Sequence, residues 1–256
     1  YRRNIRKGRN SDSSDEGGEV KEVCILSGKG GTGKTSLAAS FAVLAENKVV
    51  ADCDVDAADL HLVLSPTIIQ RSEFRSGHKA FIRQDDCLSC GACLARCHFE
   101  AVKRKGGGAG EATFTIDPLS CEGCGVCVFA CPVKAIDFPE SACGEWYVSE
   151  TRAGKLVHAR LAAGAENSGK LVSIVRQEAS RIAEAEKLEL VLIDGPPGIG
   201  CPVIASSTGC DLMVIVTEPT LSGEHDLLRV ACLARHIRIP ALVVVNKADI
   251  NLEMAE

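Results

Sequence analysis

The stretch Val20–Glu46 reads VKEVCILSGKGGTGKTSLAASFAVLAE and decides the fold of this 256-residue chain. A short apolar run leads into a glycine-rich loop, and an Ala- and Leu-rich segment without proline or glycine follows the loop. The pattern predicts a buried strand over residues 20–27 and a helix over residues 36–46. A strand, a glycine loop and a helix in this order direct the free N–H groups of the helix N-terminus at an anion.

The loop itself, GKGGTGKT over residues 28–35, matches the phosphate-binding pattern G-x-x-x-x-G-K-[ST] at every fixed position. In this pattern, backbone N–H groups surround phosphate oxygens, Lys34 reaches the β- and γ-phosphates, and Thr35 offers its hydroxyl to Mg²⁺. A glycine turn with chance lysines would leave the flanking strand and helix unexplained. The predicted nucleotide-binding residues are Gly28, Lys29, Gly30, Gly31, Thr32, Gly33, Lys34, Thr35 and Ser36.

The composition limits the class of protein. With 46% hydrophobic and only 4% aromatic residues, the chain suits an aliphatic α/β core. Its net charge of −5 gives no basic field for nucleic acid. The sequence has neither a membrane-spanning apolar run nor a secretory signal pattern, so we expect a cytoplasmic location. Fourteen cysteines without such a signal favour metal ligation over disulfides.

The two ends of the chain differ from the rest. Residues 1–18 are first basic and then rich in Ser, Asp and Gly, and we expect a disordered tail there rather than a nucleic-acid-binding arm. The sequence ends at Glu256, shortly after a strand-like run, so we expect the C-terminal part of the core to be truncated.

Eight of the cysteines form two copies of one motif. The first copy, C-x₂-C-x₂-C-x₃-C, begins at Cys87, and the second begins at Cys121. This cadence, used twice, is not typical of structural zinc sites, so iron–sulfur ligation is favoured over zinc or disulfides. The eight predicted ligands are Cys87, Cys90, Cys93, Cys97, Cys121, Cys124, Cys127 and Cys131.

Two further apolar strands end in acidic residues. The segment NKVVADCD contains Asp52 and Asp54, and the segment LELVLID ends at Asp194, immediately before Gly-Pro-Pro-Gly. Carboxylates this dense beside phosphates would repel one another without a cation, which argues for Mg²⁺. Asp56 and Asp59 fit better as solvated acidic residues at the start of a short helix. Alternating strands and helices predict an α/β fold with a doubly wound, mostly parallel sheet.

The placement of Lys29 directly after the first glycine resembles the deviant Walker A motif of the MinD/ParA ATPases, which include the nitrogenase iron protein. The resemblance covers residues 20–250. It implies ATP binding, ATP hydrolysis and dimerisation, because in that family the early lysine reaches the nucleotide of the partner subunit. Catalytic roles are therefore expected for Lys29 and Lys34, and for Asp54 as the residue that positions the attacking water.

The same resemblance implies a Mg²⁺ site and a base site. Asp194 and Asp52 are expected to hold the ion through water, with Thr35 as a further ligand. Asn246 begins the tetrapeptide N-K-A-D and is expected to contact adenine. Because N-K-x-D also reads guanine in GTPases, GTP remains an alternative nucleotide.

The two cysteine runs resemble bacterial two-cluster ferredoxins. The resemblance implies two [4Fe–4S] clusters, each held by three cysteines of one run and the last cysteine of the other. We therefore expect an α+β ferredoxin-like domain over residues 79–149, inserted between two parts of a P-loop ATPase domain, 19–78 and 150–256. Short strands at residues 79–83 before it, and at 146–149 and 156–161 after it, are expected to tether it. The expected ligand sets are Cys87, Cys90, Cys93 and Cys131, and Cys121, Cys124, Cys127 and Cys97.

Some residues outside these motifs carry weaker expectations. Cys24 and Cys232 are expected to be small buried residues. Cys201 lies seven residues after Asp194, the offset of a cluster-ligating cysteine in the nitrogenase iron protein, so a metal role stays open beside a structural one. Lys170, near a predicted helix start, is a candidate for reaching a phosphate or a partner.

These motifs favour an ATP-driven redox protein that passes electrons to a metalloprotein partner or serves it in another way. The expected assembly is a homodimer, or a dimer with a related ATPase, formed on ATP binding. One alternative is a carrier or assembly factor that delivers iron–sulfur clusters. Another is a positioning ATPase in which the clusters stabilise or sense. We expect neither nucleic acid as a partner nor a membrane span.

Overall fold

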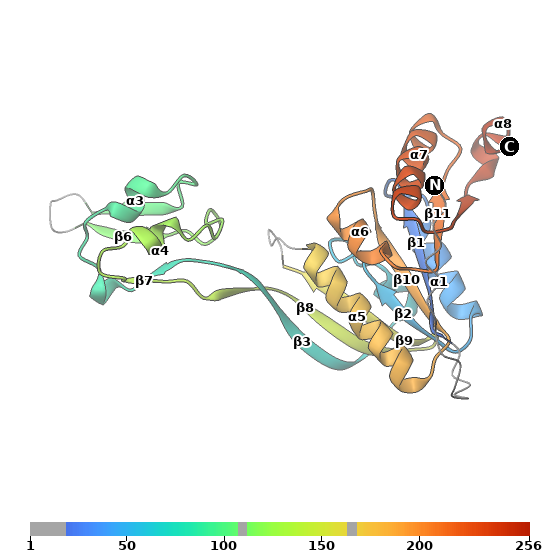
Figure 1. Cartoon of the computed structure of the whole chain (residues 1–256), viewed down its shortest axis with the longest axis horizontal. Coiled ribbons are helices and arrows are strands. Elements are labelled where there is room, and N and C mark those ends of the chain that lie inside the picture. Colours follow the sequence, from blue (N-terminus) through green and yellow to red (C-terminus); the bar gives the residue numbers. More distant parts are fainter. Residues whose placement is uncertain (1–18, 107–111, 163–167) are drawn as a thin grey trace, which may run out of the picture.

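The computed structural model describes residues 19–106, 112–162 and 168–256, which form a central sheet with helices and a small outlying domain (Figure 1). The predicted tail at residues 1–18 lies outside the described residues. The strand and helix predicted around the glycine loop are confirmed as β1 (Lys21–Ser27) and α1 (Lys34–Leu44). Within the described ranges, no helix is both long and apolar enough to cross a membrane.

The central sheet has eight strands, and most of them are parallel. Their spatial order is β12 (Ala241–Val245), β11 (Leu212–Thr217), β1, β10 (Leu190–Pro197), β2 (Lys48–Asp52), β9 (Gly154–Leu161), β8 (Glu140–Thr151) and β3 (Thr67–His78). All strands from β12 to β9 run parallel, and β8 and β3 join antiparallel at one edge. The predicted fold class is confirmed.

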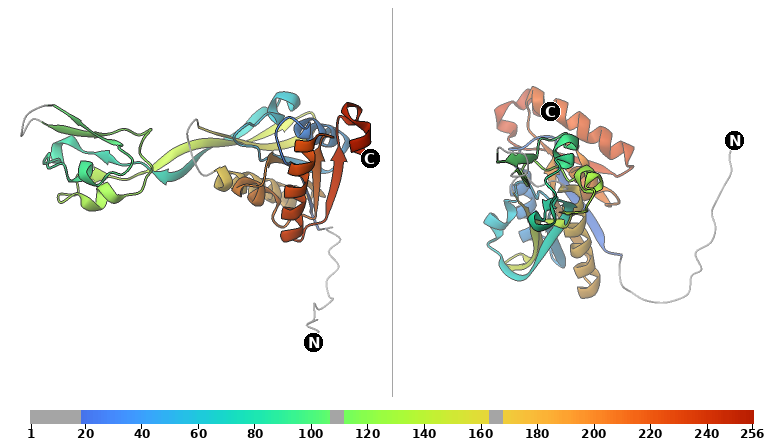
Figure 2. Two further views of the ribbon diagram at one scale, coloured as in Figure 1. Left: turned by 90° about the horizontal axis from the view of Figure 1, so that it is seen from above. Right: turned by 90° about the vertical axis from the view of Figure 1, so that its left-hand side faces the viewer.

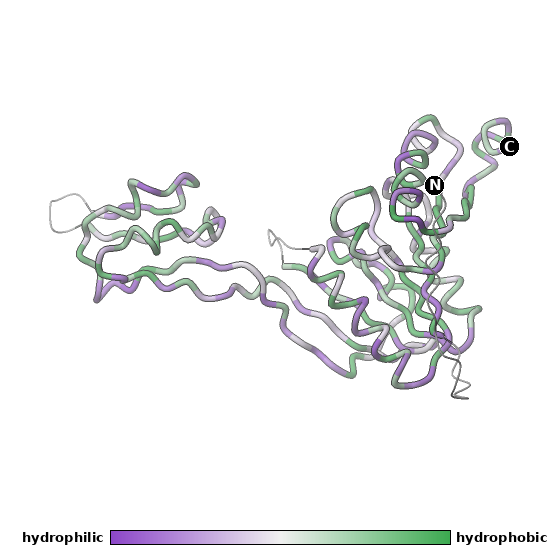
Figure 3. The backbone as a smooth tube through the Cα atoms, in the orientation of Figure 1, coloured by the Kyte–Doolittle hydropathy of each residue, from purple (hydrophilic) through white to green (hydrophobic). Residues whose placement is uncertain are grey.

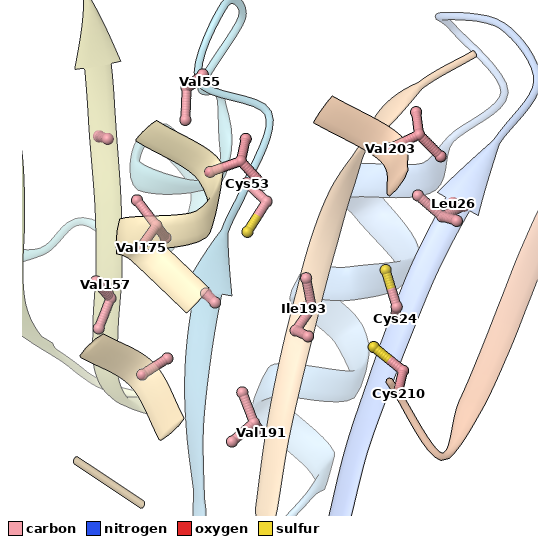
Figure 4. Close-up of a cluster of buried hydrophobic side chains, with 14 of the residues drawn as sticks. Cys24, Leu26, Cys53, Val55, Val157, Val175, Val191, Ile193, Val203 and Cys210 are labelled. Carbon is pink, nitrogen blue, oxygen red and sulfur yellow. The ribbon is translucent and has the colours of Figure 1, made fainter. Parts of the chain in front are cut away.

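Helices cover both faces of this sheet. On one face lie α5 (Ser168–Glu186), α6 (Cys201–Ser207) and α7 (Leu221–His236), and on the other lie α1 and α2 (Leu60–Leu64). Side chains alternate between the faces, as a strand requires. Cys24 and Leu26 point into the core shown in Figure 4, whereas Ile25 between them packs against the α1 side.

The register of the parallel strands brings polar side chains to one edge. Asp194 on β10 pairs with Ile25 of β1 on one side and with Asp52 of β2 on the other. Because parallel strands present their C-terminal ends at the same edge, the glycine loop, the two aspartates and the loop after β11 meet there. This edge carries the candidate nucleotide site.

The strands β3 and β8 leave the sheet as a long antiparallel ribbon that carries the small domain at its far end (Figure 2). Each strand has twelve residues. The segment expected to tether the domain at residues 79–83 is wrong in place, because β3 is the strand that leads into the domain. Only Phe81–Ile82 forms a strand in this segment, and it lies inside the small domain. The strands expected at residues 146–149 and 156–161 lie within β8 and β9, and both are longer than expected. Most side chains of β3 are exposed. Hydrophilic and hydrophobic residues are mixed along the ribbon (Figure 3), so the sequence of β3 lacks the apolar alternation that reveals a half-buried strand.

The small domain has a core of its own. Two two-stranded sheets form it, β4 (Phe81–Ile82) with β7 (Ile136–Asp137) and β5 (Val102–Lys105) with β6 (Thr113–Ile116). Two short helices, α3 (Ala92–Arg96) and α4 (Val126–Ala130), complete it. The buried residues include Ile82, Phe114, Ile136 and two of the motif cysteines, Cys93 and Cys121.

Candidate nucleotide site and iron–sulfur centres

The glycine loop ends at the first turn of α1. Gly33 has a φ of 92°, a left-handed conformation that glycine adopts at little cost, and it directly precedes Lys34. A Cβ atom on Gly33 would lie 2.2 Å from Nδ2 of Asn246, so this position also lacks the space for a side chain. The side chain of Lys34 is only 6% exposed. Its ammonium group is therefore held inside the site and not in solvent.

Carboxylates from two strand ends enclose this lysine. The Nζ atom of Lys34 lies 2.6 Å from Oδ1 of Asp194 and 3.6 Å from Oδ2 of Asp54. It also lies 3.4 Å from the hydroxyl oxygen of Thr35. Burial alone would lower the pKa of Lys34, but Asp194 and its neighbouring carboxylates raise it above its ordinary value. Lys34 therefore keeps its charge inside the protein.

The carboxylates around Lys34 outnumber the cations, and the surplus fits Mg²⁺. Asp52 and Asp194 are almost completely buried, and burial raises the pKa of both. Among the described residues, Oδ2 of Asp194 is buried without a hydrogen-bond partner. Mg²⁺ is bound in proteins by one or two carboxylates together with water and phosphate oxygens. Asp194, Asp52 and Thr35 are the residues that would hold the ion.

Asp54 lies in the loop after β2 with its side chain toward Lys34. It is 13% exposed, and burial raises its pKa. Its backbone N–H donates to Oδ1 of Asp52 over 3.2 Å, which fixes the loop against the strand end. Asp56 and Asp59 are exposed, which agrees with the solvated role expected for them.

A carboxylate that the sequence did not single out holds two lysines at the outer side of the loop. Glu218, directly after β11, places Oε1 2.6 Å from Nζ of Lys29 and Oε2 3.0 Å from Nζ of Lys247. Asn246 donates its Nδ2 to the carbonyl oxygen of Thr32 over 2.8 Å. The tetrapeptide predicted to contact the base therefore forms a hydrogen bond with the glycine loop. Lys29 follows β1, Glu218 follows β11 and Lys247 follows β12. These strand ends meet because the three strands are neighbours in the sheet, and the sequence alone does not give that order.

Two hollows in the small domain are each lined by four of the predicted cysteine ligands. A glycine in the left-handed conformation precedes each short helix, Gly91 before α3 and Gly125 before α4, so the two halves of the domain share the same local backbone conformation. Cys87, Cys90, Cys93 and Cys131 line one hollow, and Cys97, Cys121, Cys124 and Cys127 line the other. This is the exchange of the last cysteine that the ferredoxin resemblance implies.

Backbone N–H groups in the small domain point at cysteine sulfurs. The N–H of Ala135 donates to Sγ of Cys131 over 3.2 Å. Burial alone would raise the pKa of Cys97, but backbone N–H groups of residues 99–102 lower it below its ordinary value. Such donors stabilise the thiolate, which is the form that binds iron.

The arrangement of the thiols fits a cluster. No three metal-ligating side chains within the described residues converge closely enough to hold a single ion. Each set of four thiols instead surrounds a space, closed on its other sides by apolar residues such as Phe114 and Phe138. A four-iron cube, with its sulfides, lies between four thiolates in this way.

The remaining cysteines differ in burial. Cys24 is buried, as expected, but Cys232 is exposed, and the expectation of a buried side chain there is wrong. Val230 and Ala234 face the core from α7, so the residue between them points to the opposite side of the helix. Cys201 is exposed at the start of α6 and lines a groove together with Lys170.

Comparison with protein families and curated sequences gives three findings. The family model described as 4Fe-4S dicluster domain (Fer4_21) matches residues 80–138. The chain is 35% identical over 240 residues to Uncharacterized protein MJ0578 of Methanocaldococcus jannaschii, covering 91% of this chain and 80% of that protein. It is also 33% identical over 82 residues to a Ferredoxin of Pyrobaculum islandicum, covering 30% of this chain and 73% of that protein.

Comparison with solved structures returns proteins of the MinD and ParA groups. The MinC:MinD cell division protein complex of Aquifex aeolicus matches with a TM-score of 0.48 and 19% identity, covering 92% of this chain and 72% of that chain. A ParA family ATPase of Chlorobium tepidum matches with a TM-score of 0.47 and 15% identity, covering 92% and 77%.

Proposed function

We propose that this chain, which belongs to the same family as MJ0578 and joins a MinD/ParA-type P-loop fold to a 4Fe–4S dicluster domain, couples ATP-driven dimerisation to electron transfer. The electrons would pass between the dicluster domain and a metalloprotein partner. The observation that carries the proposal is a continuous set of contacts from the strand of Asp52, through β9, β8 and β3, to the loop of Cys121.

The nucleotide end supplies the machinery for phosphoryl transfer to water. The loop N–H groups and Lys34 would bind the phosphates, and Asp54 would orient the attacking water. Asp194, Asp52 and Thr35 would hold Mg²⁺, which when bound neutralises charge that develops on the phosphate oxygens. The orphaned Oδ2 of Asp194 supports this assignment, because it lies buried beside Lys34 and lacks a partner among the described residues.

Contacts lead from Asp52 to the ribbon. His158 on β9 is the register partner of Asp52 on β2, and its Nε2 lies 2.9 Å from the hydroxyl of Ser149 on β8. Tyr147, also on β8, stacks on His158 with ring centroids 5.0 Å apart. Burial lowers the pKa of His158 to about 4, so the ring is neutral at neutral pH and can pack tightly there. A shift of the end of β2 at Asp52 would therefore displace His158 and, through it, β8.

The far end of the ribbon contacts a cysteine loop. Nζ of Lys79, the residue after β3, donates to the carbonyl oxygen of Cys121 over 2.5 Å. A Cβ atom on Gly123 would lie 2.3 Å from the carbonyl oxygen of His78, so the two backbones touch. His78 also stacks on Phe138, with ring centroids 4.8 Å apart. These contacts support transmission of a ribbon movement to the hollow that Cys121 lines.

One observation favours cluster delivery as a second candidate function. Cys90 and Cys124 are exposed, one in each ligand set, so each hollow has one thiol open to solvent. A carrier would pass iron and sulfide to an apo-ferredoxin mixed with it under reducing, anaerobic conditions. A redox protein would instead reduce the intact holo-ferredoxin and retain its own iron.

Lys29→Ala tests the dimerisation part of the proposal. We expect the variant to bind ATP within about threefold of the wild-type affinity, because Lys34 still provides the main cation in its own subunit. It should fail to dimerise with ATP and should hydrolyse ATP at least about 100-fold more slowly, because the lysine proposed to reach the second nucleotide is absent. Sedimentation velocity and phosphate release are the measurements.

Lys155→Ala is a matched control, since Lys155 pairs with Glu186 away from the loop. Normal ATP-dependent dimerisation of Lys29→Ala would contradict the proposed role of this lysine.

A further inference from the structure

Glu218 occupies the junction of three strand ends. It follows β11, whereas Lys29 follows β1 and Lys247 follows β12, the two neighbours of β11 in the sheet. Each of its carboxylate oxygens takes one ammonium group, at 2.6 Å from Lys29 and 3.0 Å from Lys247. The Glu218 side chain is 13% exposed, so both pairs are shielded from water on one side.

The backbone of Glu218 is fixed by the start of α7. A Cβ atom on Gly223 would lie 2.2 Å from the carbonyl oxygen of Glu218, so glycine alone allows this approach. The N–H of Thr220 donates to that same carbonyl over 2.8 Å, and the Thr220 hydroxyl caps α7 by accepting from Gly223. The backbone from which the carboxylate extends is therefore held by contacts that do not involve Lys29.

Lys29 has a second partner besides Glu218 on its own chain. Besides Glu218, Nζ of Lys29 donates to the hydroxyl of Ser222 over 2.8 Å, so the first turn of α7 supplies a second partner. In a dimer of the proposed kind, Lys29 would have to leave these partners to reach the other subunit. Lys247 would stay, because its Nζ also donates to the carbonyl oxygen of Gly31 over 2.7 Å.

We propose that Glu218 is a positioning residue that holds Lys29 within its own subunit and thereby opposes ATP-dependent dimerisation until a second copy of the chain competes for the lysine. This inference rests on the proposed function, since it concerns the same lysine. Removal of the Glu218 charge leaves Lys29 beside a like charge on Lys247, which favours its departure.

The test is the dimer dissociation constant with saturating ATP analogue, measured by sedimentation for the wild type and for Glu218→Gln. A partly exposed ion pair contributes about fivefold to such an equilibrium, and each dimer releases two lysines, so we expect dimerisation to tighten by about 25-fold. The affinity of the monomer for ADP should stay within about twofold, because the phosphate contacts of Lys34 are intact. Damage to the fold alone would weaken dimerisation and would not strengthen it.

Glu178→Gln is the matched control, because Glu178 is also 13% exposed and pairs with Arg181 on α5. Should Glu218→Gln fail to fold, Glu218→Asp decides, because its shorter side chain cannot reach both lysines and should tighten the dimer by a smaller factor. An unchanged or weaker dimer in the folded variant overturns the inference.

A double variant separates this inference from the proposed function. If Glu218 acts through Lys29, Glu218→Gln should have no further effect on dimerisation once Lys29 is alanine. Normal dimerisation of Lys29→Ala alone contradicts the proposed function. Loss of dimerisation in Lys29→Ala, together with no gain in Glu218→Gln, contradicts only the holding role of Glu218.

Discussion

Replacement of Lys34 by alanine should abolish nucleotide binding at physiological concentrations. Among the residues that the structure describes, Lys34 is the one cation paired with Asp194 and Asp54, and its ammonium lies at the start of α1, where the phosphates would bind. A charge-assisted hydrogen bond contributes up to about 3 kcal/mol, so the affinity should fall by about 100-fold. Calorimetric titration with ADP and Mg²⁺ measures it directly.

The same variant tests whether the lysine acts through the ligand or through the fold. Removal of Lys34 leaves Asp194 buried without its cation, so some loss of thermal stability is expected as well. Lys34→Gln keeps most of the side-chain volume and should fold while still losing affinity. If Lys34→Gln binds ADP as tightly as the wild type, the phosphate site has been placed wrongly.

Cys131→Ala should remove the cluster of the hollow that the first cysteine run lines. Cys131 belongs to the second run, but it lines the hollow of Cys87, Cys90 and Cys93. Anaerobically reconstituted wild-type protein should hold about eight irons per chain, and the variant about four, because each cube contains four. Iron analysis and electron paramagnetic resonance of the reduced protein are the measurements.

Two matched variants identify which cluster is lost. The spectrum of Cys131→Ala should equal that of Cys87→Ala, which removes a ligand of the same hollow, and should differ from that of Cys121→Ala. Cys232→Ala should keep all the iron, because this cysteine is exposed on α7. A Cys131→Ala spectrum that matches Cys121→Ala would mean that the ligands do not cross between the runs.

The central sheet could be predicted from sequence because its signals are local. The apolar run before Gly28 and the runs that end near Asp52 and Asp194 each mark a buried parallel strand, and each carries its polar residue at the C-terminal end. The eight cysteines can likewise be recognised as cluster ligands from their spacing alone. In the strands, burial on both faces requires apolar residues, and in the two runs, ligation of iron requires cysteine at fixed spacings.

The ribbon and the Glu218 junction could not be predicted in this way. Most residues of β3 are exposed to solvent, so its sequence has no alternation of apolar and polar residues that would distinguish it from a loop. Glu218 is a single acidic residue after a strand, and its role depends on which strands are neighbours. The contact of His158 with Ser149 likewise depends on the pairing of β8 with β9.

The contact between His158 and Ser149 also offers a way to weaken coupling without touching either ligand site. Ser149→Ala removes the hydroxyl that meets Nε2 of His158 at the step from β9 to β8. The variant should bind nucleotide and iron as the wild type does, but should lose at least about half of any coupling free energy between them.

The affinity of the iron-loaded protein for ATP analogue, measured once oxidised and once reduced with dithionite, tests the coupling directly. Coupling requires the nucleotide states to differ in their contacts with the ribbon, and linkage then requires the oxidation state of the clusters to change the affinity by the same free energy. We predict a change of about 5- to 150-fold between the two oxidation states, the usual range of allosteric coupling. Equal affinities in the oxidised and reduced protein, together with equal cluster potentials under ATP analogue and ADP, would contradict it.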